Sequence, residues 1–598
     1  MDKKNTTIGI ALLLAAFAAL YFGQKYAPPP APRPVAPMQA APAATPGTPG
    51  AVATPGTAGQ PGLFVAPISE PELQDVVSLA NAYVDVTFTE YGGAIREVAF
   101  RKYPAQKGSP APYLFNQLHA APVLAFVGQP GLDVGTRWQM VEKTANRIVF
   151  RAVADGKLEV TRTFTLQQEG SKQDPYRLEV ATVLRNLSTE AMGAQRVAWN
   201  LGTAVPVNAS DSGMYLNAGW WNAEKMTYIG RNDLQASGGF LGMGAHEARP
   251  FIETPASVVW ASVKNQFFAS VFTPDQPGAG TVVRRIKIVD NLADTNPAAF
   301  GVTADILLDL PRLEPGASAT LGGKIYVGPK EYQRLKEFGK SEENVMQFSY
   351  NWYTSMFFTW FFAPLLLTIL TWFHGLIPNW GWAIILTTIA LKTVTLPLTL
   401  AAAKSSKRMA KIQPRLKELN EKYADNPEKK QKATMELFKE AKVNPLGGCL
   451  PILITMPFFF GFYAMLQTSS DLRFAEFFWI KDLASPETFA RLPFLLPNGI
   501  PINIMPLLMG VTQVIQMQLM PTPSVDNAQA KMFKFMPYMM IFFFYNFGSG
   551  LALYWTVSNA FTILQQLIIN RMPEHAPVAS AADGLKNVTP SGRKPKRK

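Results

Sequence analysis

Long apolar runs between residues 350 and 570 constrain this 598-residue chain more than any other feature of its sequence. A helix of about twenty apolar residues is long enough to cross about 30 Å of hydrocarbon. Residues 64–328 instead alternate between apolar and polar side chains over short stretches, which is typical of strands. The sequence therefore predicts a multi-pass α-helical membrane protein with a large all-β domain outside the membrane.

The distribution of charge predicts which side of the membrane each part faces. The block Lys404–Lys442 is strongly basic, and the positive-inside rule makes it cytoplasmic. The apolar run Ile8–Phe22 follows two lysines and predicts an anchor with a cytoplasmic N-terminus, or alternatively a cleaved signal peptide. With that anchor in place, only one of the next two apolar runs can cross. We expect Trp380–Leu400 to cross, and Gln347–Leu376 to lie along the outer interface, where its Tyr and Trp side chains are favoured.

This assignment gives six transmembrane helices, with both termini and the basic tail in the cytoplasm. Their expected bounds are Ile8–Phe22, Trp380–Leu400, Gly448–Leu466, Ile502–Met520, Phe535–Phe547 and Leu551–Asn570. The fifth span would be only about 20 Å long at the helical rise. Such a short span predicts local thinning of the bilayer.

The composition of the chain predicts its domain organisation. Residues 27–62 are rich in Pro and Ala and almost free of charge, which is typical of an unfolded spacer. Regularly spaced strands predict an antiparallel β-sandwich, and Asp155-Gly156 predicts a hairpin turn within it. The expected segments are an anchor (1–26), a linker (27–62) and a β domain (63–330) on the side away from the cytoplasm, an interfacial region (331–378), a helical core (379–571) that includes a cytoplasmic helical hairpin (401–445), and a basic tail (572–598).

Lys392 is the only charged residue between Trp380 and Ala403. Placing a lysine there costs about 2.5–3.5 kcal/mol on insertion scales. None of the six expected spans contains Asp or Glu, so an ion pair within the membrane is excluded. Thr388, Lys392, Thr395 and Thr399 share one helical face. This pattern favours a water-containing cavity, although a lysine neutralised by burial or bound to an acidic partner chain would also fit.

The sequence contains no motif for catalysis or for a metal or cofactor. The four histidines are scattered, the single cysteine is Cys449, and no nucleotide-binding loop or hydrolase signature is present. Because intramembrane carboxylates are missing, proton or sodium coupling is not expected either. A channel or transporter for small solutes and an anchored carbohydrate-binding module remain as alternative functions.

Methionines are frequent in the expected spans. Flexible thioether side chains suit a surface that contacts many different apolar partners, although each one alone is more often core filling. The methionines that we expect along such a sliding surface are Met456, Met465, Met536 and Met540.

Three segments resemble the YidC/Oxa/Alb family of membrane-protein insertases, in its Gram-negative type with a large periplasmic domain. They are KVNPLGGCLPILITMPFFFGFYAML (442–466), FMPYMM (535–540) and SGLALYWTVSNAFTILQQ (549–566). The resemblance implies a five-helix insertase core and a periplasmic all-β supersandwich similar to galactose mutarotases. It further implies insertion and folding of integral proteins in the bacterial inner membrane, alone or with the Sec translocon, without enzymatic activity or a cofactor.

The resemblance also implies roles for particular residues. Family members carry an arginine in a hydrophilic groove, and Lys392 stands at that position here, which keeps the charge but loses the guanidinium fork. Thr388, Trp555 and Ser558 align with groove or substrate-contact positions. The expected partners are nascent membrane proteins, the Sec translocon (SecYEG and SecDF), the ribosome, the signal-recognition-particle receptor and membrane lipids, but not DNA. The expected ribosome or targeting contacts are Lys404, Lys407, Arg408, Lys411, Arg593, Lys594, Lys596, Arg597 and Lys598.

Overall fold

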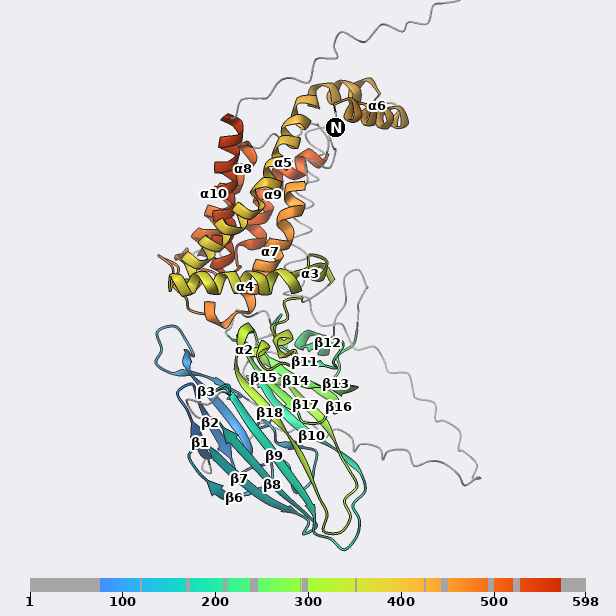
Figure 1. Ribbon diagram of the computed structural model, residues 1–598, viewed down its shortest axis with the longest axis vertical. Helices are drawn as coiled ribbons and strands as arrows, with labels where there is room; N and C mark the ends of the chain where they lie inside the picture. The colour runs from blue at the N-terminus through green and yellow to red at the C-terminus, as the bar shows by residue number, and fades with distance from the viewer. Residues whose placement is uncertain are drawn as a thin grey trace, which may run out of the picture. The chain divides into compact units, whose positions relative to one another are not determined.

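The computed structural model shows two compact units, which are described separately here (Figure 1). The first contains the chain up to Phe348 together with Gln467–Asp471, and the second contains Ser349–Leu466 and the chain from Leu472 onward. The structure describes residues 76–118, 121–167, 173–207, 211, 213–236, 246–290, 292, 299–349, 352–423, 426–441, 450–492, 500–519 and 528–571. The expected anchor, linker and basic tail therefore lie outside the described residues.

The first unit is built from antiparallel strands in three sheets. Their orders are β1-β2-β3-β4, β13-β16-β17-β10-β5 and β12-β11-β14-β15-β18-β9-β8-β7-β6. The strands are β1 Val76–Ala80, β2 Val84–Thr89, β3 Ala94–Pro104, β4 Pro112–Phe115, β5 Phe126–Val127, β6 Gln139–Lys143, β7 Arg147–Ala154, β8 Leu158–Leu166, β9 Arg177–Asn186, β10 Gln195–Ala204, β11 Asn217–Trp221, β12 Met226–Gly230, β13 Phe251–Val258, β14 Trp260–Lys264, β15 Phe268–Pro274, β16 Gly278–Lys287, β17 Phe300–Leu310 and β18 Ser318–Pro329. Short helices η2 Arg231–Leu234, α2 Tyr332–Lys336 and η4 Glu342–Met346 complete the unit.

The nine-stranded sheet forms one layer of a sandwich, and the two smaller sheets form the other. Phe88 of β2 packs on Phe164 of β8, with ring centroids 5.0 Å apart, and Trp199 of β10 packs on Phe272 of β15 at 5.7 Å. A bridge between Ile95 and Val123 links the four-stranded sheet to the segment that leads into β5. The predicted antiparallel β-sandwich is confirmed, whereas the similarity to galactose mutarotases stays a prediction.

Local sequence explains how the strands form and where they turn. Along β8 every second side chain is buried, as expected for a strand with one face on the core. Between β7 and β8, Asp155 and Gly156 have φ values of 50° and 67°, and Lys157 N donates to Ala154 O at 2.9 Å. The hairpin turn predicted at Asp155-Gly156 is thus confirmed.

Arg162 lies inside the sandwich core. Arg162 is fully buried, with its guanidinium carbon 4.7 Å from the ring centroid of Phe126 and 4.9 Å from that of Trp199. Its Nε donates to Thr182 Oγ1 at 3.0 Å, and its Nη1 donates to Leu124 O at 2.6 Å. Aromatic faces and backbone carbonyls therefore replace the water that a guanidinium normally binds.

The second unit is a helical bundle with one small two-stranded sheet. Its helices are α3 Trp352–Met356, α4 Thr359–Leu376, α5 Trp380–Lys422, α6 Pro427–Glu440, α7 Leu450–Thr468, η6 Ser470–Leu472, α8 Ile504–Leu519, α9 Ala528–Phe544 and α10 Ser549–Arg571, and its strands are β19 Ala490–Leu492 and β20 Ile500–Ile502. The last residues of α7 and the first of η6 belong to the first unit by their contacts. Helix α10 packs against both α5 and α8.

Helix α5 runs without interruption for 43 residues, from Trp380 to Lys422. Asn379 caps its start, because the side chain accepts a hydrogen bond from Trp382 N at 3.2 Å. Its second half is the first arm of the expected hairpin, and α6 forms the returning arm. Apolar side chains such as Ile412 pack with Phe438 between the two arms.

The helix that contains the expected thirteen-residue span is longer than that span, while the extent of its membrane crossing stays a prediction. Helix α9 begins at Ala528 and has 17 residues, which corresponds to about 26 Å. The lysines in its first two turns lower the local hydropathy without ending the helix, so hydropathy placed its start too late. Helix α4 and the segment Trp380–Ala403 each have the length and composition of a membrane span. The interfacial position of Gln347–Leu376 and the total of six spans both stay predictions.

Candidate functional site

Polar side chains of α5 and α10 meet along a line that we call the α5–α10 seam, consisting of Lys392, Thr399, Thr562 and Gln565. Lys392 Nζ donates to Thr562 Oγ1 at 3.2 Å, and Gln565 Nε2 donates to Thr399 Oγ1 at 3.1 Å. Residue numbers rise in the same direction on both helices, from Lys392 and Thr562 to Thr399 and Gln565. Helices α5 and α10 therefore run parallel along this contact. The seam therefore brings the lone charge of α5 against neutral polar groups of α10.

Lys392 has no acidic neighbour in the bundle helices. It is half-buried, and among the described residues its ammonium group has one hydrogen-bond partner, the hydroxyl of Thr562. The helix segments 380–403, 450–468, 504–519, 528–544 and 549–571 contain neither Asp nor Glu. An ammonium group can donate three hydrogen bonds, so this arrangement leaves the cation able to bind water or an anionic group.

The other threonines of the expected stripe bond to their own helix. Thr388 Oγ1 donates to Ile384 O at 2.7 Å, and Thr395 Oγ1 donates to Leu391 O at 2.9 Å. Thr388 is also buried. The expectation that Thr388 faces an open groove was therefore wrong, because neighbouring side chains enclose it. Thr399 shares the face of Lys392 and contacts Gln565 of α10.

A second set of polar contacts joins α10 to α8. Trp555 Nε1 donates to Gln513 Oε1 at 3.0 Å, and Asn559 Nδ2 donates to Thr512 Oγ1 at 3.1 Å. Of these four residues, the sequence assigned a role only to Trp555. The spacing of 555, 559, 562 and 566 along α10 could have identified this polar face.

Trp555 and Ser558, both expected at groove or substrate-contact positions, differ in their surroundings. The Trp555 ring packs edge-on against Phe459 of α7, with centroids 4.5 Å apart, and Phe544 of α9 lies 5.8 Å away. Ser558 is half-buried, and its carbonyl accepts a hydrogen bond from Thr562 at 2.9 Å. Trp555 thus stands where four helices meet, while Ser558 borders the seam.

The methionines expected on a sliding surface do not share one environment. Met465 is fully buried, so its assignment to an accessible surface was wrong, and it fills the core instead. Met456 and Met540 are half-buried. The side chain of Met536 lies outside what the structure describes.

The basic residues expected to contact a ribosome lie partly within the described chain. Arg408 and Lys411 are exposed on the second half of α5. The side chains of Lys404 and Lys407, and the whole tail from Arg593 to Lys598, lie outside the described residues.

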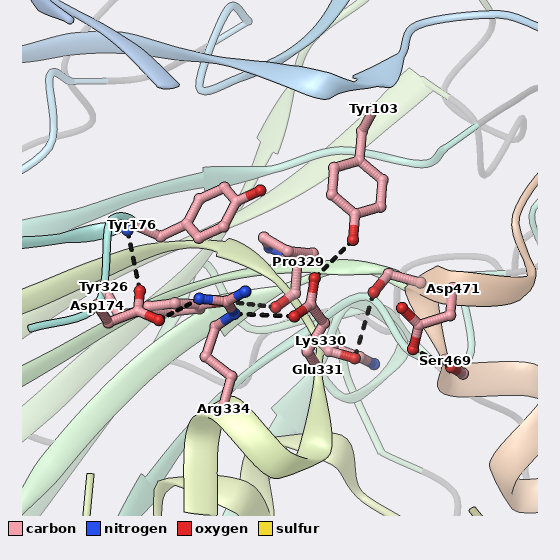
Figure 2. Close-up of polar contacts among 11 residues, drawn as sticks. Tyr103, Asp174, Tyr176, Tyr326, Pro329, Lys330, Glu331, Arg334, Ser469 and Asp471 are labelled. Atoms are coloured by element: carbon pink, nitrogen blue, oxygen red, sulfur yellow. Dashed lines mark hydrogen bonds and ion pairs between the residues drawn. The ribbon is translucent and has the colours of Figure 1, made fainter. Parts of the chain in front are cut away.

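The first unit holds a separate polar network at the end of β18 (Figure 2). Tyr103 donates to Glu331 Oε1 at 2.7 Å, and Arg334 Nε lies 2.8 Å from Glu331 Oε2 and pairs with Asp174 as well. Asp471 belongs to the same unit and accepts from Ser469 at 3.1 Å. Burial raises the pKa of Asp471 to about 6, and the nearby Glu331 carboxylate adds to the shift.

Two buried lysines lie close to this network. Lys330 Nζ donates to Asn265 O at 3.3 Å, and Lys264 Nζ donates to Gln347 Oε1 at 2.5 Å. Both are fully enclosed, and both ammonium groups lie within 6 Å of the Tyr215 ring centroid, at 5.4 and 5.8 Å. Burial lowers the pKa of Lys330 to about 7, and burial together with the Lys330 charge lowers the pKa of Lys264. Neither lysine was singled out from sequence.

Comparisons with known proteins cover both units. The family described as YidC periplasmic domain matches residues 76–367, and the family described as 60Kd inner membrane protein matches residues 372–576. A protein of Pseudomonas fluorescens named Membrane protein insertase YidC is 30% identical over 606 residues, covering 97% of this chain and 100% of its own. Proteins of the same name from Chlorobium luteolum and Chlorobaculum parvum are 31% and 29% identical. They cover 74% and 85% of this chain and 70% and 84% of their own lengths.

Proposed function

Because this chain belongs to the YidC family of membrane protein insertases of the inner membrane, we propose that it performs insertion through the α5–α10 seam. The polar, often acidic, flank of a nascent membrane protein contacts Lys392, which replaces part of the water bound to that flank. The apolar segment of the substrate then moves into lipid. Burial of that segment stabilises the product, at about 25 cal/mol per Å² of apolar surface, so no nucleotide hydrolysis is required.

One observation carries this proposal. Lys392 is held against a neutral hydroxyl, in helices that contain no carboxylate. A permanent structural role would be served better by an ion pair, because an unpaired cation in a low-dielectric setting is costly. An incoming acidic flank supplies the missing counter-charge, and the charge remains available for the next substrate after release.

The test is membrane insertion in cells depleted of the endogenous insertase. We expect Lys392→Arg to support insertion of substrates with charged flanks and Lys392→Ala to fail with them. Thr393→Ala serves as the matched control, because Thr393 is the exposed neighbour whose hydroxyl donates to Ile389 O of its own helix. Normal insertion of acidic-flank substrates by Lys392→Glu would refute the role of the charge.

We further propose that the protein cooperates with the Sec translocon and that both of its termini are cytoplasmic. Ribosomes or the signal-recognition-particle receptor dock on the basic α5–α6 hairpin and tail. The exposure of Arg408 and Lys411 supports such docking. If ribosome co-sedimentation is unchanged after removal of 593–598 together with Arg408→Glu and Lys411→Glu, this contact does not exist. Deleting residues 64–328 would separate a role of the β domain from that of the helical core.

A further inference from the structure

A two-residue turn between α7 and α8 presents two aromatic side chains to the outside of the helical unit. Phe477 N donates to Ile480 O at 2.9 Å, and Ile480 N donates to Phe477 O at 2.8 Å, so Phe478 and Trp479 form the tip. Phe478 is 74% exposed and Trp479 is 45% exposed. Burying two such rings away from water is favourable, because it removes large apolar surfaces from solvent.

The residue types at this tip are unusual for the backbone conformation found there. Phe478 has φ 49°, a left-handed conformation that glycine, asparagine or aspartate normally supplies at a hairpin tip. The same chain uses the usual residues elsewhere, because Asp155-Gly156 forms the β7–β8 turn with positive φ at both positions. A bulky residue in this region strains the backbone. An exposed Phe-Trp tip is therefore unfavourable in water both for its backbone and for its side chains.

The base of the tip is firmly held. Phe477, Ile480 and Leu483 are buried beneath it. Asp482 Oδ1 accepts hydrogen bonds from Phe474 N and Ala484 N, both at 2.9 Å. The two aromatic rings thus project from a fixed platform rather than from a freely moving loop, which lowers the entropic cost of burying them elsewhere.

The tip lies beside the first turn of α5. The Trp382 ring centroid is 6.1 Å from that of Phe478 and 5.7 Å from that of Phe477. Asn379, which caps α5, donates to Glu476 O at 3.2 Å. The exposed rings of Trp382, Phe478 and Trp479 therefore gather at the end of the apolar segment Trp380–Ala403. Tryptophan is enriched at this level of membrane proteins, where its ring contacts both headgroups and acyl chains.

We propose that the Phe478-Trp479 tip inserts into the boundary between headgroups and acyl chains of the lipid leaflet at the start of α5. The partner is a lipid surface, because the tip continues the aromatic side chains at the end of a membrane-length helix. The insertion fixes the depth of the α7–α8 loop in the membrane. It also fixes the start of α10, because Ser549 N of that helix donates to Ser485 O of the loop at 2.9 Å. This inference rests on the proposed membrane crossing of α5.

The test uses the full chain in lipid vesicles of phosphatidylethanolamine and phosphatidylglycerol, carrying one fluorescent label on an introduced cysteine in a Cys449→Ser background. The tip label is at Phe478→Cys. Lys157→Cys, at the β7–β8 turn, is the aqueous control, and Val394→Cys, which is 78% exposed on α5, is the membrane control. Quenching is measured with a water-soluble quencher and with lipids brominated at shallow or deep acyl positions.

We expect the label at 478 to be quenched most by shallow brominated lipids and to be several-fold less accessible to the aqueous quencher than the label at 157. Aqueous quenching at 478 equal to that at 157, with lipid quenching retained at 394, would overturn the tip insertion while leaving the crossing of α5 intact. Loss of lipid quenching at 394 as well would overturn the proposed crossing together with the inference. Protection of 478 without lipid quenching would indicate a protein partner and would also overturn the proposal.

Discussion

Replacing Lys330 with methionine should stabilise the β-sandwich unit at neutral pH. Lys330 is fully buried, and its pKa falls from an ordinary 10.5 to about 7 on folding. One pKa unit corresponds to about 1.4 kcal/mol, so this fall corresponds to a cost of folding of about 5 kcal/mol at pH 7 and below. Methionine fills a similar volume without a charge. Losing the hydrogen bond to Asn265 O offsets part of the gain, which leaves about 1–4 kcal/mol.

The sign of the pH dependence follows from proton binding. Between pH 7 and 10.5 the unfolded lysine is protonated while the folded lysine is mostly neutral, so the unfolded state binds more protons. Stability of the unmodified protein therefore rises with pH across this range, by up to about 1.4 kcal/mol per pH unit for this lysine. Lys264, whose pKa is also lowered, acts in the same direction. The advantage of Lys330→Met should shrink as pH rises and disappear near pH 10.5.

The assay is urea unfolding of the full chain in detergent, followed by tryptophan fluorescence at pH 7 and pH 9.5. Lys324→Met is the matched control, because Lys324 lies on β18 but is 44% exposed. A surface substitution of this kind changes stability by less than about 0.5 kcal/mol. If Lys330→Met lowers stability equally at both pH values, the buried lysine is not the source of the cost, and the reasoning fails.

Three further predictions concern packing, the buried arginine and the network of Figure 2. Gly381→Ala should destabilise the helical unit by about 1–3 kcal/mol, because an added Cβ would collide with the Phe477 ring. Gly375→Ala, which meets nothing within 4 Å, should not destabilise it, and equal thermal shifts for both would contradict this account. Arg162→Lys should cost about 2 kcal/mol or more in urea unfolding, because an ammonium cannot make the fork-shaped set of hydrogen bonds. A neutral outcome would mean that the aromatic cage alone holds the charge. Asp471→Asn should raise stability at pH 7 and not at pH 4. The raised pKa of Asp471 means that the folded state binds the extra proton, so stability falls as pH rises from about 4 to about 6. Stability curves of the variant and the unmodified protein that run parallel across that range would disprove it.

Sequence pattern predicted the features that depend on local periodicity. The alternation in residues such as 158–166 gave strands with one buried face, and Asp155-Gly156 gave the turn between two of them. The acid-free helices and the lone Lys392 indicated a water-containing cavity, which stays a prediction. Helical spacing put Thr399 on the same face as Lys392, and in the structure both side chains contact α10.

Features that depend on tertiary contacts escaped prediction. Hydropathy placed the start of α9 too late, since the lysines in its first two turns lowered the average without breaking the helix. Spacing alone could not tell that the Thr388 hydroxyl bonds to its own backbone or that Met465 is enclosed. Lys264 and Lys330 are enclosed by chain segments that lie far apart in sequence. A local sequence pattern therefore cannot predict their burial.

The unbroken length of α5 has a mechanical consequence. Pro397 lies between Lys392 and Thr399 within that helix, and it removes the backbone donor that would hold the carbonyl of Thr393. The helix continues for 25 residues beyond it to Lys422, which is about 38 Å. A bend of 5° at the proline would therefore displace the far end by about 3 Å, by simple lever geometry over that length. Bending at Pro397 would thus couple a movement of the α5–α6 hairpin to the positions of Lys392 and Thr399 relative to each other in the seam.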